Sequence, residues 1–344
     1  MSRGIRGLLL VLGSTATIVG CGRAPQGPPV QVTVPRGATF QDVVDTLETQ
    51  GLVGSATAFS LYARLRGDDR RIRAGRYEFR PGTSWNAILA DLRAGRVITE
   101  PVTIPEGFTL DLMAPRLADI TGLDANSVAV VLHDTVRAED LAVPGPGLEG
   151  YLFPDTYRFA PGASLDTVLH TMVERYRAFW TGARRRDLKA LGMNEREAVT
   201  LASIVQAEAR EVEEMPLISG VYHNRLERGY PLQADPTVLY ALGGPRERLL
   251  YAAMDSVADD PYNTYTHPGL PPGPIGAPGE DALEAALHPA ETDFLYFVAR
   301  PDGRHIFSRT LTEHNRAVAR ARRAWDSVRA GDTTSPPTGG RPPP

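Results

Sequence analysis

Short stretches of alternating hydrophobic and polar residues, each followed by a helix with one hydrophobic face, recur in the first third of the chain. Three segments, beginning at Gln31, Arg76 and Val102, each combine an alternating strand, a Gly-containing turn, a Thr or Ser helix cap and a helix with one apolar stripe. In the first segment, Thr39 and Asp42 have the spacing of a capping box. Units this small bury little surface alone, so we expect them to pack on one another. The repeat predicts architecture, and no residue in it demands a ligand.

From Ser164 the hydrophobic positions follow the helical period instead. A helix that begins there places seven apolar residues on one face, namely Leu165, Val168, Leu169, Met172, Tyr176, Phe179 and Trp180. Gly and Pro then recur densely from about 229 to 279, a composition typical of an ordered loop that lines a site. A buried-type strand over 294–298, a hairpin through Gly303 and a final helix over about 312–328 complete the predicted elements. The Pro/Gly/Thr-rich residues 329–344 are expected to form a disordered tail.

One carboxylate interrupts the apolar stripe of another predicted helix. That helix begins at Asn194, with Glu197 completing its cap, and its stripe runs through Ala198, Leu201, Val205, Glu208 and Val212. Burial disfavours the charged form of a carboxyl group and raises its pKa, which is what a general acid for glycoside cleavage requires. The alternative is that the helix ends near Ala207 and Glu208 is solvated, as the acidic residues that follow it suggest.

Composition and charge exclude several classes of protein. The formal net charge is −4, and no Lys/Arg block interleaved with aromatic residues occurs, so we expect no nucleic-acid partner. The histidines lack the paired spacing of a zinc site, and we therefore predict no metal and no cofactor. There is no G-x-S-x-G motif for a serine nucleophile and no P-loop for a nucleotide.

The N-terminus indicates export. Arg3 and Arg6 precede an apolar run over 7–20, which is too short to span a bilayer comfortably and is typical of a secretory signal. Cys21, the only cysteine, follows this run as in a bacterial lipobox and is the predicted lipidation site. A short single-pass anchor is the alternative, and both interpretations place the remaining chain outside the cytoplasm. A Pro/Gly-rich linker is expected over 22–29.

The C-terminal half resembles the endolytic murein transglycosylases, the YceG-like family. The resemblance extends over about residues 100–320 and rests on these ordered motifs: LEGYLFPDTY at 148–157, the helix from Leu201 to Glu208, VYHNRL at 221–226, LQADPTV at 232–238, YNTY at 262–265, GLPPGPI at 269–275, HPA at 288–290 and EHN at 313–315. The N-terminal repeats are similar to LysM-type modules, which bind glycans containing N-acetylglucosamine. A purely structural role for these repeats remains the alternative.

The resemblance implies an α+β fold with five parts. We expect a signal with a lipobox over 1–21, the linker over 22–29, a LysM-like strand–helix subdomain over 30–100, a mixed α/β transglycosylase region with a central acid-bearing helix over 101–328, and the tail over 329–344. Members of the family cleave the β-1,4 bond between N-acetylmuramic acid and N-acetylglucosamine and leave a 1,6-anhydro end. This implies a lyase that terminates glycan strand elongation, at the outer face of the inner membrane.

The resemblance also carries residue roles. The family's catalytic Glu falls in the segment that ends at Glu208, and relatives commonly have a second Glu where this chain has Gln206. An amide cannot donate a proton as an acid, so Glu208 is the predicted sole acid and base. Seven further residues are predicted to hold the glycan, with Arg225 alternatively paired to Glu149 or Asp235: Asn224, Arg225, Gln233, Asp235, Asn263, Tyr265 and Tyr151.

The expected partners are peptidoglycan glycan strands, the membrane through the N-terminal anchor, and cell-wall synthases. A different class of function is a non-catalytic glycan-binding envelope lipoprotein that scaffolds wall synthesis. Activity of the chain and its loss on substitution of Glu208 distinguish the two hypotheses.

Overall fold

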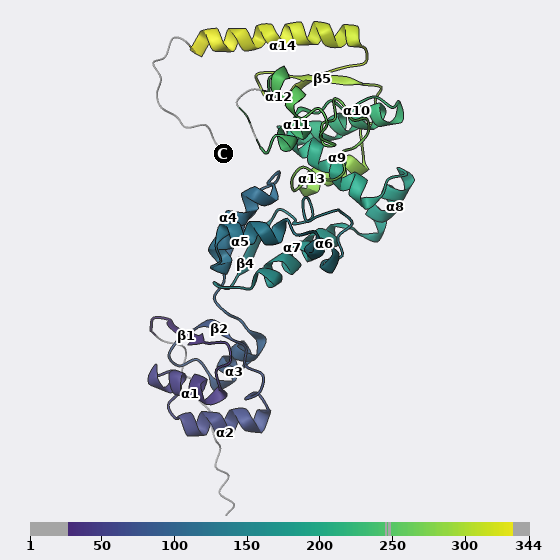
Figure 1. The fold of residues 1–344 in the computed structure, drawn as a ribbon. Helices are drawn as coiled ribbons and strands as arrows, with labels where there is room; N and C mark the ends of the chain where they lie inside the picture. The colour runs from purple at the N-terminus through teal and green to yellow at the C-terminus, as the bar shows by residue number, and fades with distance from the viewer. Residues whose placement is uncertain (1–26, 245, 247–248, 333–344) are drawn as a thin grey trace, which may run out of the picture. The chain divides into compact units, whose positions relative to one another are not determined.

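The computed structural model describes residues 27–244, 246 and 249–332. The chain divides into two compact units, one ending at Thr99 and one beginning at Glu100 (Figure 1). The predicted signal with Cys21, most of the linker and residues 333–344 lie outside the described residues. Within the described ranges, no helix is both long and apolar enough to cross a bilayer.

The N-terminal unit is a two-stranded sheet covered by three helices. Its elements are β1 (Val30–Val34), α1 (Phe40–Thr49), α2 (Ala56–Arg66), β2 (Gly75–Phe79) and α3 (Trp85–Ala94). The strands pair antiparallel with Val32 opposite Tyr77, and both side chains enter one core with Phe59, Ile88 and Leu92. The predicted capping box is present, because Thr39 and Asp42 exchange hydrogen bonds at the start of α1. The repeat did not predict α2, because Leu61 and Leu65 lie on its exposed side and obscure its stripe.

The third predicted repeat belongs to the other unit, which corrects the expectation that all three pack together. Its strand β3 (Glu100–Thr103) pairs antiparallel with β4 (Thr156–Phe159). Its helix α4 (Leu110–Thr121) packs against α5 (Ala125–Leu132) and α7 (Leu165–Phe179). The predicted face of α7 is confirmed, since all seven apolar residues are buried. Two shorter helices occur in the same part of the chain: α6 (Thr135–Asp140) precedes β4, and α8 (Gly182–Ala190) follows α7.

Helix α9 (Glu195–Glu208) is the centre of the remaining chain. It packs against α10 (Met215–Glu227), α11 (Asp235–Ala241) and α13 (Glu280–Leu287), and residues 198–205 are all buried. A short 3₁₀ helix, η1 (Val212–Glu214), joins α9 to α10, and α12 (Tyr251–Ser256) lies in the long Gly/Pro-rich segment. The fold is therefore α+β with small sheets, as the sequence predicts.

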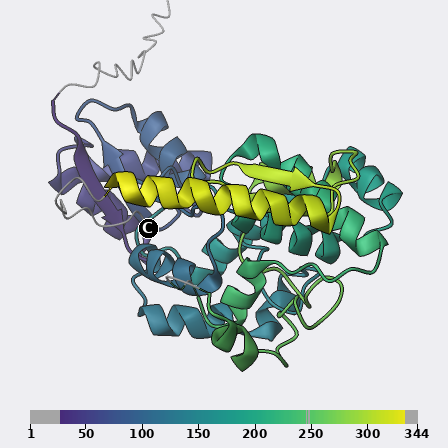
Figure 2. The ribbon, with the colours of Figure 1, turned by 90° about the horizontal axis from the view of Figure 1, so that it is seen from above.

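A hairpin and a long helix end the described chain. Strands β5 (Tyr296–Ala299) and β6 (His305–Ser308) pair antiparallel through the predicted turn. Helix α14 (Leu311–Asp332) lies across this hairpin and contacts both strands (Figure 2). Two predictions are corrected here: β5 is half-buried, and α14 extends through residues 329–332 of the predicted tail.

Candidate functional site

Helix α9 carries Glu208 at its last residue. The helix begins with a complete capping box between Asn194 and Glu197. At Ala209 the backbone leaves the helical conformation with a ψ of 131°. The predicted stripe therefore stops at Glu208, and Val212 lies in η1 with 48% of its surface exposed. The helix does end where the solvated alternative expected, but Glu208 is half-buried and faces a cavity.

The cavity beside Glu208 has a volume of about 530 Å³. One wall is formed by Glu208, Arg225, Gln233, Asp235 and Tyr265, which come from α9, α10, the segment around the start of α11 and the loop after α12. The facing wall comes from β5, β6 and the start of α14: Tyr296, Phe297, Val298, Ala299, His305, Leu311, His314 and Asn315. The C-terminal hairpin and helix thus complete the pocket that contains the candidate acid.

The surroundings of Glu208 suit a group that both gives and takes a proton. Burial raises its pKa from 4.5 to about 7, and the nearby negative charge of Asp235 acts in the same direction. The buried Tyr222 hydroxyl opposes this shift, because it donates a hydrogen bond to Oε1 at 3.1 Å and favours the carboxylate. Near neutral pH both forms of Glu208 are populated, which is the condition for general acid–base catalysis.

Gln206, two residues before Glu208 on the same helix, makes its side-chain hydrogen bond away from the cavity. Its Oε1 accepts a hydrogen bond of 2.9 Å from the backbone N–H of Gly279, at the start of α13. Gln206 does not line the cavity of Glu208. The side chain at this position therefore joins two helices, and Glu208 is the acid that faces the cavity.

Asp235, Tyr265 and Gln233 are held together beside Glu208. The Tyr265 hydroxyl donates to Asp235 Oδ1 at 2.6 Å. Gln233 has a positive φ of 50°, and its N–H donates to the Thr264 carbonyl oxygen at 3.1 Å. Non-glycine residues in this strained conformation cluster at functional sites.

Arg225 lines the cavity, but its N–H groups donate hydrogen bonds to backbone carbonyl oxygens of the protein. Its guanidinium donates to the carbonyl oxygens of Leu295 and Leu232, both at 2.7 Å, and to that of Pro231 at 3.2 Å. It also lies 5.3 Å from the centre of the Tyr296 ring. The predicted pairing with Glu149 or Asp235 is corrected, because Arg225 joins α10 to the loop before α11 and to the C-terminal hairpin.

Three of the predicted glycan-binding residues do not line this cavity. Asn224 donates to the carbonyl oxygens of Thr292 and Phe294, at 2.8 and 2.9 Å. Asn263 is 1% exposed, and its side chain closes a turn by accepting from the Tyr265 N–H. Tyr151 is completely buried in the core, so it cannot stack on a sugar. These side chains stabilise the loops that carry the site.

Five residues at the site were not predicted as functional: Tyr222, Tyr296, His305, His314 and Asn315. Tyr222 lies one turn before Arg225 in the same motif, and His314 and Asn315 belong to the EHN motif, so a signal for these three was present. His305 is fixed by Glu214, whose carboxylate lies 2.8 Å from Nδ1 and also accepts from the backbone N–H. Among the described residues, no group of three His, Cys, Asp or Glu side chains is placed to hold a metal ion.

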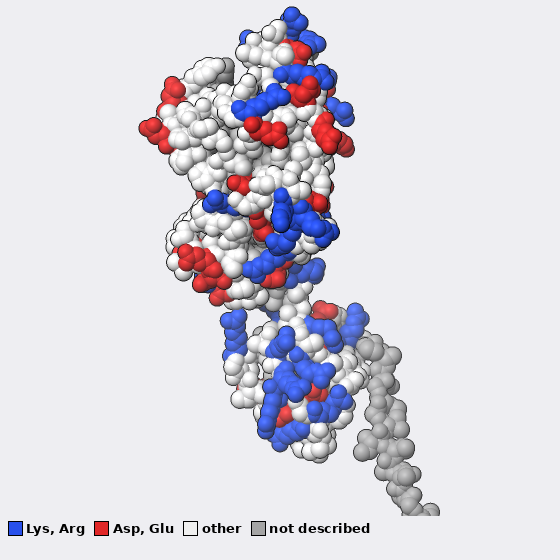
Figure 3. All heavy atoms as spheres, turned by 90° about the vertical axis from the view of Figure 1, so that its right-hand side faces the viewer, with Lys and Arg blue, Asp and Glu red and all other residues white. Residues whose placement is uncertain are grey.

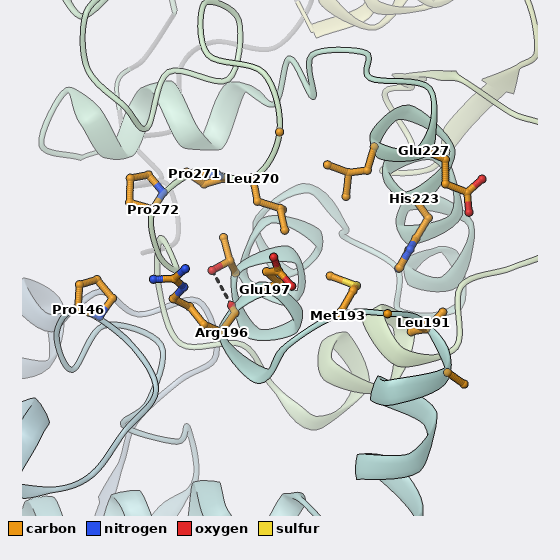
Figure 4. A pocket seen from close by; sticks show the side chains of 15 residues that line it. Pro146, Leu191, Met193, Arg196, Glu197, His223, Glu227, Leu270, Pro271 and Pro272 are labelled. Carbon is orange, nitrogen blue, oxygen red and sulfur yellow. Dashed lines mark hydrogen bonds between the residues drawn. The ribbon is translucent and has the colours of Figure 1, made fainter.

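A larger cavity of about 860 Å³ lies at the opposite end of α9 (Figure 4). Arg196 and Glu197 face it from the helix, with Pro272 on one side and Glu227 on the other. The Glu197 carboxylate accepts the Asn194 N–H at 2.8 Å and thereby caps α9. The smaller cavity is the better candidate for chemistry, because it contains Glu208, whose pKa is raised by burial to about 7.

Replacing Tyr222 with Phe is expected to raise the pKa of Glu208 above 7, because a donor to the carboxylate is lost while the ring stays. If Glu208 acts as a general acid, only its protonated form is active, so the alkaline limb of the pH–rate profile should move to higher pH. The exposed Tyr230 makes Tyr230→Phe the matched control. An unshifted limb in Tyr222→Phe would show that the hydroxyl does not tune the acid.

Comparisons of this chain with known protein families, sequences and structures agree with one another. Residues 32–320 match the YceG-like family. A Bacillus subtilis (strain 168) protein named endolytic murein transglycosylase is 34% identical over 304 residues, covering 84% of this chain and 83% of that protein. A Streptococcus pneumoniae (strain D39) protein of the same name is 33% identical over 84% of this chain, which covers 58% of that protein. The crystal structure of a Listeria monocytogenes protein described as YceG-like is 32% identical, with a TM-score of 0.58 over 85% of this chain and 99% of that one.

Proposed function

Because this chain belongs to the YceG-like family, we propose that it is a peptidoglycan lytic transglycosylase whose acid and base is Glu208. The relatives named endolytic murein transglycosylase support the class of reaction. The observation that carries the proposal is the carboxyl of Glu208, which faces a cavity and has a pKa of about 7. The substrate is the β-1,4 bond between N-acetylmuramic acid and N-acetylglucosamine.

The proposed reaction uses one carboxyl group in two roles. Protonated Glu208 donates its proton to the glycosidic oxygen while the bond from this oxygen to C1 of the muramyl residue breaks. The resulting carboxylate accepts the proton of the C6 hydroxyl on the same sugar, and the C6 oxygen bonds to C1. The products are a 1,6-anhydro end and a free hydroxyl, and Glu208 is protonated again. Because the nucleophile belongs to the substrate, its effective concentration is high and no activated water is required.

The other polar residues of the cavity support this chemistry. Positive charge develops at C1 as the bond breaks, and the Asp235 carboxylate lies in the same cavity as the acid. Tyr265 fixes Asp235, and Gln233 offers an amide for a hydroxyl or acetamido group. Tyr296 lies on the opposite wall, where its ring stacks on His314.

The cellular role that follows is termination of strand growth. A cut within a nascent strand ends its elongation and leaves an end that lacks a reducing sugar. We place the enzyme at the extracytoplasmic face of the membrane, held through Cys21 or through the N-terminal apolar run, where synthases produce the strands. The LysM-like strand–helix unit over 30–100 would add affinity for the glycan.

The nature of the product tests the proposal. The chain from Gly22 onward, incubated with peptidoglycan in heavy-oxygen water, should release fragments with anhydro ends that carry no heavy oxygen. Heavy oxygen at the new ends would identify a hydrolase in which Asp235 activates water. Binding without any released product would instead support the scaffold hypothesis.

A further inference from the structure

The charges of the N-terminal unit are segregated along its sequence. Helix α1 carries Asp42, Asp45 and Glu48 and no basic residue. From residue 64 to residue 96 the chain has only four acidic residues but nine arginines: Arg64, Arg66, Arg70, Arg71, Arg73, Arg76, Arg80, Arg93 and Arg96. All nine arginines are exposed. This unit therefore has an acidic helix and a strongly basic stretch.

Contacts bring the segments that carry these arginines together. Arg66 and Arg93 reach the same buried carboxylate, Asp68, at 3.0 and 3.3 Å. The Arg73 side chain lies against Gly95, and the Arg73 N–H donates to the Leu92 carbonyl oxygen at 3.0 Å. The end of α2, the loop before β2 and the end of α3 are thus neighbours.

We call this surface the arginine face and define it as Arg66, Arg70, Arg71, Arg73, Arg76, Arg93 and Arg96. Figure 3 shows Lys and Arg side chains gathered over one side of the unit that follows the grey N-terminal residues. Arg96 is paired with Asp91, and Arg66 and Arg93 share Asp68. The other four have no carboxylate partner among the described side chains. The excess positive charge is not needed to hold the unit together.

We propose that the arginine face binds the headgroups of anionic phospholipids and holds the N-terminal unit against the membrane surface. Guanidinium groups match phosphate oxygens through paired hydrogen bonds. Basic residues close to a bilayer are attracted by its negative surface potential, and the attraction fades within about one Debye length, roughly 8 Å. An extended anionic surface fits a face of seven arginines better than a single small anion does.

The position of the anchor favours the lipid over other polyanions. Eight residues separate Cys21 from Val30, the first residue of β1, so a fully extended chain places the two at most about 30 Å apart. A tether this short gives the unit a high effective concentration at the membrane, so that weak headgroup contacts suffice. The inference rests on the proposed envelope anchor but not on catalysis by Glu208.

Vesicle binding by the chain from Gly22 onward tests the proposal without the anchor. The buried core residues of the described units lie between Val32 and Ala321, so this chain keeps both cores. The test variant is Arg70→Gln, Arg71→Gln and Arg73→Gln combined. The matched control neutralises three exposed arginines of α14, with Arg316→Gln, Arg320→Gln and Arg323→Gln. Co-sedimentation is measured with phosphatidylglycerol vesicles, phosphatidylcholine vesicles and purified peptidoglycan.

The expected result is salt-sensitive binding to phosphatidylglycerol vesicles and little binding to phosphatidylcholine. The triple variant of the arginine face should bind about 100-fold more weakly, since each basic residue contributes about fivefold. The α14 control should bind like the parent chain. Equal losses in both variants, or no binding to anionic vesicles, would overturn the proposal. Loss of peptidoglycan binding with unchanged vesicle binding would assign the face to the wall polymer instead. Retained lytic activity in the triple variant would show that the enzyme is intact.

Discussion

Glu208→Gln is expected to lower the rate of glycan cleavage by about 10³-fold or more, because the amide neither donates the proton to the leaving oxygen nor accepts one from the C6 hydroxyl. The substitution preserves the size of the side chain and leaves an amide oxygen that can accept the Tyr222 hydrogen bond. Folding should therefore be unchanged. Release of soluble fragments from peptidoglycan measures the loss, and a thermal unfolding curve checks the fold.

The matched control is Glu213→Gln. Glu213 is an exposed residue of η1 only five positions along the chain, so the pair separates position in the pocket from loss of a negative charge. The control should keep the full rate. Comparable rates in Glu208→Gln and the parent chain would refute the assignment of the acid, because Gln206 cannot replace it and is bound to Gly279.

Glu149→Gln is expected to remove most of the pH dependence of stability between about pH 5 and pH 8. Burial raises the pKa of Glu149 from 4.5 to about 8. Hydrogen bonds from the Leu110 N–H, the Tyr240 hydroxyl and the Gly150 backbone oppose the shift without cancelling it. The other carboxyl oxygen is buried without a partner among the described atoms. The protonated group is therefore the form that fits this site.

The sign of the effect follows from which state holds the proton more tightly. The folded chain retains the Glu149 proton up to about pH 8, whereas the unfolded chain loses it near pH 4.5. The contribution to the free energy of unfolding is complete at low pH and lost as the pH rises through 8, by roughly 5 kcal/mol at most. Neutral Gln does not titrate, so the free energy of unfolding of Glu149→Gln should fall less as the pH rises. Glu208 contributes a smaller fall of the same sign, with its folded pKa of about 7.

Urea unfolding at a series of pH values checks this prediction. Glu139→Gln is the control, since Glu139 is an exposed carboxylate on α6 close to Glu149 in sequence. The free energy of unfolding of the control should fall with rising pH as it does in the parent chain. If the free energy of unfolding of Glu149→Gln falls as steeply with pH as that of the parent chain, another group is responsible for the titration.

The elements that the sequence predicted well are those in which one face is buried and the caps are regular. The buried face of α7 and the start of α9 follow directly from periodicity and from the Asn194 cap. Periodicity failed where apolar residues are exposed, as with Leu61 and Leu65 of α2, and where the chain leaves a helix before its stripe ends, as at Val212. Local patterns also do not show which strand pairs with which, so β3 was grouped with the wrong partners.

The candidate site was predicted in the same uneven way. A carboxylate on an apolar stripe is a local signal, and it singled out Glu208, which lines the candidate cavity. Whether a polar loop residue faces a cavity or a backbone carbonyl depends on partners far along the chain. Arg225 and Asn224 contact carbonyl groups some 70 residues away, at Leu295 and Phe294. No spacing near either residue encodes that choice. The EHN motif singled out His314, but it did not show that this residue would line the cavity of Glu208.

The cavity wall opposite Glu208 comes from the C-terminal part of the chain, and this has a consequence for biosynthesis. Glu208 is made more than 80 residues before β5, and the wall that contains Tyr296 and His314 is supplied by β5, β6 and α14. Until that wall is in place, water reaches the carboxyl group and its pKa stays close to that of an ordinary glutamate. A growing or truncated chain therefore carries Glu208, the proposed acid, without the wall that completes its cavity. We therefore expect the proposed cleavage of the polymer that holds the cell together to begin only once the chain is nearly complete.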